Sequence, residues 1–269
     1  MKRVLCPTLP RLGSPVDLPE SEANHVIKVL RLRDGEHLQA MDGKGHAVIG
    51  VLRIWGSRTC LELAEDQSEL KTIRTPAQGS DTSTVTLEMA VIKGDAMEWV
   101  IEKSVELGVR YFVPVLTAHT VIQVSKKGPE AFQERWQKIA DQALKQCGRL
   151  ESMQVSLPID LEELLSTAPA SESEPRLWFD EAGRGSVDEF LPWVMDQKPS
   201  PEGFRLLIGP EGGWSDSERE FLTRSIQSSF QRLSLSPLVL RAESAAISAI
   251  SLATASLRAI KSGKLTTTQ

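Results

Sequence analysis

Two stretches of the sequence combine residue types that could hold and act on a ligand. The first is the glycine-rich run of residues 209–213, which directly follows the apolar run of residues 206–208. An apolar run without alternation is typical of a strand that is covered on both faces. Gly212 and Gly213 permit backbone angles closed to other residues and let a ligand approach the main chain. This stretch predicts a turn at the carboxyl end of a buried strand, where open α/β sheets bind ligands.

A helix is expected directly after this turn. Ser215 suits its N-cap, and Glu218 completes a capping box three positions later. The glycines before the helix offer backbone N–H groups to a nucleotide-like ligand. A purely structural strand-to-helix turn explains the same spacing, so the pattern alone leaves both interpretations open.

The second stretch contains Arg241 and Glu243, just before a run of alanines and serines at residues 244–248. Close helix packing explains the small residues, and the helix dipole favours Glu243 at a helix N-terminus. Arg241 is different, because it ends the apolar, strand-like run of residues 237–240. We expect a partly buried cation there, which needs an anionic or polar partner.

Several other chemistries are not supported. The sequence has no dinucleotide-binding G-x-G-x-x-G after a strand, no phosphate-binding G-x-x-x-x-G-K-[ST] and no nucleophile elbow G-x-S-x-G. The three cysteines and four histidines are dispersed, which predicts neither a disulfide framework nor a metal site and favours a reducing compartment. No signal-peptide core or run of transmembrane length is present, so we expect a cytoplasmic protein.

Composition and charge are ordinary for a globular protein. Hydrophobic residues make up 41% and charged residues 25% of the 269 residues, and the formal net charge is −5. This length fits one large or two modest domains. The negative charge argues against a generally basic nucleic-acid coat but is compatible with local basic patches. Residues 24–33 form one such patch, with Lys28, Arg31 and Arg33 and no acidic side chain.

The hydrophobic pattern predicts two domains. Residues 1–71 read as short strands with hairpin signals such as Asp42-Gly43, which suggests a small β-barrel. One helix is expected over residues 21–30, with Ser21 as its cap and Val26, Ile27, Val29 and Leu30 mostly on one side. Residues 72–83 have the composition of a linker.

Residues 84–269 alternate strand and helix patterns, the signature of an α/β domain with a mainly parallel sheet. Strands are expected at 85–92, 111–116, 176–179, 205–208 and 231–235. Helices are expected from Asp95, with Glu98 in its capping box, to Gly108, and over 130–147 and 243–260. The last helix carries one apolar stripe of Ile247, Ile250, Ala253, Leu257 and Ile260.

Taken together, these segments resemble one family. Residues 208–215 and 240–246 are similar to motifs of the bacterial ribosomal RNA small-subunit uridine-N3 methyltransferases (the RsmE family). Residues 93–108 and 25–31 and Asp42-Gly43 also match, in order, so the resemblance covers essentially the whole chain. It implies an N-terminal PUA-like β-barrel and a C-terminal trefoil-knotted α/β domain of the SPOUT superfamily. It also implies a homodimer with the active site near the dimer interface.

The resemblance further implies the cofactor S-adenosylmethionine, held by three loops. Their expected cofactor-binding residues are Phe179, Glu181, Ile208, Gly209, Pro210, Glu211, Gly212, Gly213, Leu235 and Leu240. The family commonly has glycine after the leucine of the third loop, where this chain has Ser236. A Glu-Arg-Ser-like triplet of the family is replaced here by residues 118–120, which include His119.

The reaction implied is methylation of a uridine N3 in 16S ribosomal RNA. Arg241 is our candidate for stabilising the charge that develops on the uracil, and Glu243 and His119 are candidate bases. The expected RNA contacts are His25, Lys28, Arg31 and Arg149. Two alternatives remain: a related SPOUT methyltransferase with another target nucleotide, and a non-catalytic RNA-binding protein of ribosome assembly. The glycine-rich run and the Arg241–Glu243 pair favour an enzyme.

Overall fold

The computed structural model describes residues 1–67, 84–120, 128–168, 170–182, 185–186, 190, 192–194, 201–226 and 229–262. The expected linker, residues 72–83, lies outside these ranges. Contacts divide the chain into two compact units. Unit 1 comprises Met1–Asp81 and Asp141–Ser152, and unit 2 comprises Thr82–Ala140 and Met153–Gln269. Within the described residues, no helix combines the length and apolar character needed to cross a membrane.

Unit 1 is built on a five-stranded sheet with the order β1-β3-β4-β5-β2. The strands are β1 (Arg3–Leu5), β2 (Val16–Asp17), β3 (His37–Met41), β4 (Ala47–Trp55) and β5 (Arg58–Leu63). β1 pairs with β3 in parallel, and the other pairs are antiparallel. The expected hairpin is confirmed between β3 and β4. Its turn is held by Asp42 Oδ1, which accepts hydrogen bonds from the backbone N–H groups of Lys44 (2.7 Å) and His46 (3.0 Å).

The helix expected over residues 21–30 forms, but not as the pattern predicts. It begins as α1 (Glu20–Asn24) and continues as a π-helical turn, η1 (His25–Val29). Its N-cap is Pro19 rather than Ser21, because the extended proline precedes the first turn and its carbonyl accepts the N–H of Ala23. The wider π turn changes the angular spacing of the side chains. Val29 is therefore 66% exposed instead of sharing the buried face of Val26.

Unit 2 contains an eight-stranded sheet, which confirms the expected α/β class. The strand order is β11-β13-β10-β12-β6-β7-β8, with β9 also paired to β7, and every pair is parallel. The strands are β6 (Thr84–Ala90), β7 (Tyr111–Leu116), β8 (Gln154–Val155), β9 (Ile159–Asp160), β10 (Arg176–Phe179), β11 (Gly185–Ser186), β12 (Gly203–Ile208) and β13 (Phe230–Ser234). The five longer strands of unit 2 lie where the hydrophobic pattern predicts them.

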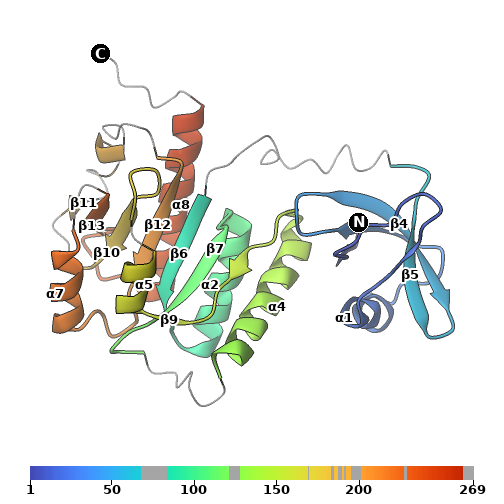
Figure 1. The fold of residues 1–269 in the computed structure, drawn as a ribbon, viewed down its shortest axis with the longest axis horizontal. Helices are drawn as coiled ribbons and strands as arrows, with labels where there is room; N and C mark the ends of the chain where they lie inside the picture. Colours follow the sequence, from blue (N-terminus) through green and yellow to red (C-terminus); the bar gives the residue numbers. More distant parts are fainter. Residues whose placement is uncertain are drawn as a thin grey trace. The chain divides into compact units, whose positions relative to one another are not determined.

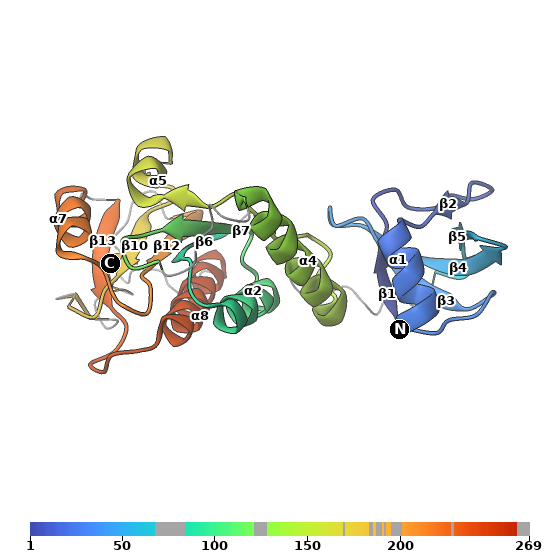
Figure 2. The ribbon, with the colours of Figure 1, turned by 90° about the horizontal axis from the view of Figure 1, so that it is seen from below.

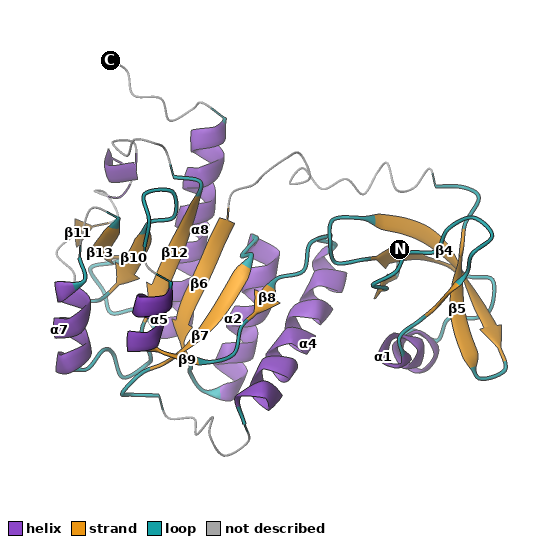
Figure 3. Cartoon of the chain, in the orientation of Figure 1, coloured by secondary structure: helices purple, strands orange, loops and turns teal. Residues whose placement is uncertain are grey.

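Helices cover both faces of this sheet. They are α2 (Gly94–Leu107), α4 (Pro129–Cys147), α5 (Leu161–Thr167), α7 (Asp216–Arg224) and α8 (Ala242–Lys261), with α4 continuing into unit 1. In unit 2, α2 and α8 lie on one face and α5 and α7 on the other (Figures 1 and 2). Helix α5 and the two-residue strands, which Figure 3 shows beside the longer elements, were not predicted. α8 buries Ile250, Ala253 and Leu257 of its expected stripe.

The start of α2 also differs from the expectation. Lys93 is the N-cap and no side chain caps the helix, so the expected capping box of Asp95 and Glu98 is wrong. The chain is already helical at Gly94, which places Asp95 inside the first turn, where its charge still suits the helix dipole. Glu98 instead pairs with Arg135 of α4. Gly108 ends the helix as predicted, with a φ of +94°.

A buried ion triad joins the central strands of the unit 2 sheet. Glu88 of β6 is fully buried and accepts two hydrogen bonds from Arg176 of β10, from Nε to Oε2 (2.6 Å) and from Nη2 to Oε1 (2.9 Å). Arg205 of β12, which lies between these strands, donates from Nη1 to Glu88 Oε1 at 2.9 Å. Because the Glu88 carboxylate bonds one arginine on β12 and one on β10, we infer that the triad fixes the register of β10, β12 and β6.

The substitution Glu88→Gln should lower the free energy of unfolding by about 3–5 kcal/mol, because it leaves the buried Arg176 guanidinium without its counter-charge. The matched control is Glu106→Gln, whose partner Lys103 lies at the surface of α2 and whose loss should cost less than about 1 kcal/mol. Urea unfolding followed by tryptophan fluorescence measures both, since Trp99, Trp136, Trp178, Trp193 and Trp214 all belong to unit 2. Equal losses in the two variants would contradict a register-fixing triad.

Candidate functional site

A cleft of about 620 Å³ lies at the carboxyl ends of β10, β12 and β13. Its walls are the segments that follow these strands, together with the first residues of α8 and the start of α2. Parallel strands end at the same edge of a sheet, so segments distant in sequence meet there. The cleft is lined by every residue expected to bind a cofactor: Phe179, Glu181, Ile208, Gly209, Pro210, Glu211, Gly212, Gly213, Leu235 and Leu240. Arg241 and Glu243 line the same cleft.

The glycines of residues 209–213 occupy positions where a side chain would be crowded or the backbone strained. A Cβ at Gly209 would lie 2.8 Å from Trp214 Nε1, and a Cβ at Gly212 would lie 3.3 Å from the Cβ of His119. Gly213 has a φ of +69°, in the left-handed region that favours glycine. The run therefore presents main chain, rather than side chains, to the cleft.

The predicted capping box at the start of α7 is confirmed, and it anchors this run. The backbone N–H of Glu218 donates to Ser215 Oγ (3.3 Å), and that of Ser215 donates to Glu218 Oε2 (2.8 Å). Glu218 Oε1 also accepts the backbone N–H of Ala118 (2.8 Å), which ties the cap to the segment after β7. The main chain of the run is thus fixed from the helix that follows it.

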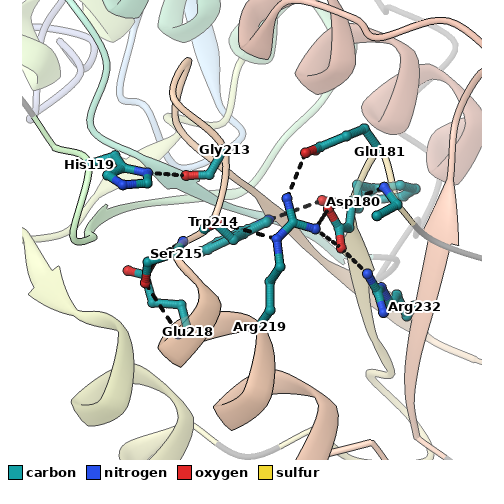
Figure 4. A network of polar contacts seen from close by, with 11 residues as sticks. His119, Asp180, Glu181, Gly213, Trp214, Ser215, Glu218, Arg219 and Arg232 are labelled. Carbon is teal, nitrogen blue, oxygen red and sulfur yellow. Dashed lines mark hydrogen bonds and ion pairs between the residues drawn. The ribbon is translucent and has the colours of Figure 1, made fainter.

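His119 packs against the glycine-rich run. Its Nδ1 lies 2.8 Å from the carbonyl oxygen of Gly213 (Figure 4). His119 is not among the residues that line the cleft. Its position therefore favours support of the run over contact with a bound ligand.

The segment after β13 corrects one sequence-based expectation. Residues 237–240 do not continue a strand, and the Arg241 side chain is 86% exposed rather than partly buried. The turn forms because Ser234 Oγ donates to the carbonyl of Ser236 (3.0 Å) and Ser236 Oγ accepts the N–H of Leu238 (3.0 Å). Leu238 is consequently 74% exposed at the edge of the cleft.

Arg241 is the N-cap of α8, and Glu243 lies in its first turn. The Arg241 Nη1 and Glu243 Oε1 atoms are 3.9 Å apart, and the Glu243 side chain is 23% exposed. An ion pair of this length with one exposed partner contributes little to stability. The Arg241 guanidinium is therefore available to a ligand in the cleft.

Comparison with known proteins places this geometry in a family. A family model described as an RNA methyltransferase domain matches residues 80–254, which include the whole cleft. A second model, described as an RNA methyltransferase PUA domain, matches residues 18–53. The chain belongs to the RNA methyltransferase family.

Individual RNA methyltransferases agree with this assignment and confirm the resemblance to the RsmE family. Ribosomal RNA small subunit methyltransferase E of Bacillus subtilis is 27% identical over 241 residues, covering 88% of this chain and 90% of that protein. The protein of the same name from Synechocystis is 29% identical over 240 residues, covering 87% of this chain and 71% of that protein. The solved structure of ribosomal RNA small subunit methyltransferase E from Neisseria gonorrhoeae, bound to S-adenosyl methionine, is 28% identical. It superposes with a TM-score of 0.76 over 93% of this chain and 96% of that chain.

Two charged residues of this methyltransferase cleft were missed by the sequence reasoning. Asp180 follows β10, and Lys93 precedes α2. The backbone N–H of Lys93 donates to Glu211 Oε1 at 3.1 Å, which links the start of α2 to the glycine-rich run. The sequence could have predicted Asp180 as a cleft residue, because it is a charged residue directly after a buried apolar strand. Lys93 begins the family-like segment 93–108, but nothing in the sequence indicated that it lines the cleft.

The expected RNA contacts all belong to unit 1 of the methyltransferase. Lys28 and Arg31 are exposed, whereas His25 and Arg149 are partly buried. Arg31 has a φ of +52° and is the one non-glycine residue with a positive φ in the part of the chain that the structure describes. Arg31 lies two residues after the end of the π-helical turn η1. Two unusual backbone features therefore lie close together in the basic segment of residues 24–33. Such features concentrate at functional sites.

The substitution Gly213→Ala should loosen the glycine-rich run, because alanine in the left-handed region costs about 1–2 kcal/mol. Its Cβ would also lie 3.4 Å from Glu181 Oε1. The expected result is faster hydrogen–deuterium exchange in the peptide covering residues 209–218, measured by mass spectrometry. Gly94→Ala is the matched control, since a Cβ there meets no atom within 4 Å and the φ is not positive. Identical exchange in the two variants would show that the backbone angle of Gly213 does not constrain the run.

Proposed function

We propose that this chain transfers the methyl group of S-adenosylmethionine to N3 of a uridine in the 16S ribosomal RNA of the small subunit. The observation that carries the proposal is the meeting of residues 209–213 with Arg241 and Glu243 in one cleft. Family membership supports the reaction class, and the relatives named for ribosomal RNA of the small subunit support the substrate. We infer a cytoplasmic location from the proposed substrate, because ribosomal RNA is found in the bacterial cytoplasm.

The residues of the cleft fit S-adenosylmethionine. A volume of about 620 Å³ suits a ligand of nucleoside size. Gly212 and Gly213 let the ligand approach the main chain, and Phe179, Ile208 and Leu240 supply apolar surface for a purine ring. Glu181 supplies a carboxylate that can accept hydrogen bonds from ribose hydroxyl groups. The solved Neisseria gonorrhoeae relative carries this cofactor.

When bound, S-adenosylmethionine supplies an electrophilic methyl group on a sulfonium. The uracil N3–H is a weak acid, so a base must take its proton as the methyl group is transferred. The exposed guanidinium of Arg241 is placed to stabilise the negative charge that develops on O2 and O4 of the uracil. Of the two candidate bases, Glu243 lines the cleft and His119 does not, which favours Glu243.

We also infer that unit 2 is a trefoil-knotted SPOUT domain and that the sheet of unit 1 is a PUA-like barrel. Strand β13 pairs on the side of β10 away from β12, and α8 then returns to pack against β12 and β6. This return path supports a knot, and the PUA family match supports the barrel. The domain limits proposed are 1–71 and 84–269, joined by residues 72–83.

A homodimer is proposed as the functional form. Val239 is 81% exposed and Leu238 74% exposed, and both line the edge of the cleft. Adjacent exposed apolar side chains beside a binding site favour coverage by another macromolecular surface. A second copy of the chain would complete the wall of the cleft that these residues leave open.

Mass mapping of 16S ribosomal RNA from a strain lacking this protein tests the function. We expect the loss of one methyl group on a uridine and its return when purified protein and S-adenosylmethionine are added to isolated small subunits. Loss at another nucleotide would favour a related SPOUT methyltransferase. An unchanged RNA, together with no calorimetric heat on titration with S-adenosylmethionine, would favour a non-catalytic assembly protein.

The substitution Arg241→Ala should lower kcat by about 10²–10³-fold, the range seen when a group stabilising transition-state charge is removed. The Kd for S-adenosylmethionine, measured by calorimetry, should change by less than about threefold, because the guanidinium acts on the uracil. Arg258→Ala is the matched control, since Arg258 is an exposed arginine in the last turn of the same helix. Equal losses in kcat and in cofactor affinity would make Arg241 a cofactor-site residue instead.

The substitution Arg31→Gln should weaken RNA binding and reduce the slope of log K against log salt by about 1, the effect of losing one phosphate contact. Filter binding of ribosomal RNA across a salt series measures both quantities. Arg11→Gln is the control, because Arg11 is an exposed arginine of the same unit outside the basic segment. An unchanged slope in Arg31→Gln would remove Arg31 from the RNA contact surface.

A further inference from the structure

One guanidinium, that of Arg219 in α7, contacts two walls of the cleft (Figure 4). Its Nη1 donates to both carboxylate oxygens of Asp180 (2.5 and 2.6 Å), and its Nη2 donates to Glu181 Oε1 (2.6 Å). Its Nε donates to the carbonyl of Trp214 (3.2 Å), at the end of the glycine-rich run. Arg219 therefore joins the segment after β10 to the segment after β12.

The same network reaches the third wall through Asp180. This carboxylate is buried, and it also accepts a hydrogen bond from Arg232 of β13. The Asp180 backbone N–H donates to the carbonyl of Leu233 at 3.0 Å, and the Arg232 guanidinium lies 4.6 Å from the ring centroid of Trp178. Because β13 leads directly into residues 235–240, Asp180 links Arg219 to all three walls.

The Arg219 pairs are stronger than ordinary surface ion pairs. Burial alone would lower the pKa of Arg219, but the hydrogen bond to Glu181 and the charge of Asp180 outweigh it and raise the pKa above its ordinary value. Arginine is protonated at ordinary pH, and these carboxylates favour its charged form further. A planar guanidinium can bond two carboxylates and a carbonyl at once, which an ammonium group cannot do in the same geometry.

Of the two carboxylates of the network that line the cleft, Glu181 is the exposed one and Asp180 the buried one. The Glu181 side chain is 44% exposed, so without a partner it would occupy several rotamers. Arg219 bonds Oε1, and among the described residues no hydrogen bond is made to Oε2, which leaves that oxygen for a ligand. Gly213 lies directly beside the pair, since a Cβ there would be in ordinary van der Waals contact with Glu181 Oε1 (3.4 Å) and Arg219 Nη2 (3.6 Å).

We propose that Arg219 is a positioning residue that holds Glu181 in the orientation required by the hydroxyl groups of the bound nucleoside cofactor. The inference rests on the proposed function, which makes S-adenosylmethionine that ligand. Arg219 does not line the cleft itself and acts through Glu181 and the main chain at Trp214. Removing it should therefore weaken cofactor binding while leaving the chemical step, once the cofactor is bound, nearly intact.

The test compares Arg219→Gln and Arg219→Lys with a control in the same helix, Arg224→Gln. The Arg224 side chain is 69% exposed and pairs only loosely with Glu220, at 3.5 Å. Calorimetry gives the Kd for S-adenosylmethionine, and methyl transfer to small subunits gives kcat and KM. We expect at least a tenfold higher Kd and cofactor KM in Arg219→Gln with kcat changed less than threefold, a smaller rise in Arg219→Lys, and no change in Arg224→Gln.

A double-mutant cycle with Glu181→Gln separates positioning from general support of the fold. If Arg219 acts through Glu181, Glu181→Gln should raise the Kd in the unaltered protein but by much less in the Arg219→Gln background. Additive effects, or an unchanged Kd in Arg219→Gln, would overturn the inference while cofactor binding by the unaltered protein stands. Absence of cofactor binding by the unaltered protein would instead overturn the proposed function, and with it the ligand assigned to Glu181.

Discussion

The buried carboxylate of Glu88 is the constraint on which the site depends. It bonds Arg176 and Arg205 and so fixes three neighbouring parallel strands in one register. In that register Phe179 of β10 lies opposite Ile208 of β12 on one side and Leu233 of β13 on the other. The strands therefore end level with one another, and the segments that follow them emerge side by side. A slip of one residue would turn every side chain to the other face and separate these walls.

A second network of ion pairs lies at the carboxyl edge of the same sheet. Asp180, with Arg219 and Arg232, ties together the segments after the strands, as Glu88 ties the strands themselves. Both carboxylates are buried and each contacts two arginines. The triad around Glu88 determines where the cleft forms. The network around Asp180 holds Glu181 in its orientation within the cleft. The glycine-rich run supplies main chain between them, which suits a nucleoside ligand better than a rigid wall of side chains would.

Local features of the chain were predictable from sequence, but contacts between residues far apart in the sequence were not. The buried strand before residues 209–213 and the capping box of Ser215 each depend on residues that are close together in the sequence. The hydrophobic pattern and residue types therefore predicted both. Arg241 was expected to be partly buried because its apolar neighbours resemble a strand, but serine side chains turn that segment outward. The bonds between Asp180 and Arg219 join residues 39 positions apart, which no periodicity encodes. The resemblance to a family named residues that line one cleft, but it did not show which contacts hold them there.

A crystal structure of this protein with S-adenosylmethionine tests the central claim most directly. The account predicts the nucleoside against the main chain of residues 209–213, its ribose hydroxyl groups bonded to Glu181, and the sulfonium methyl group directed toward Arg241. A cofactor bound elsewhere on the protein, or held in the cleft with its methyl group directed away from Arg241, would contradict it.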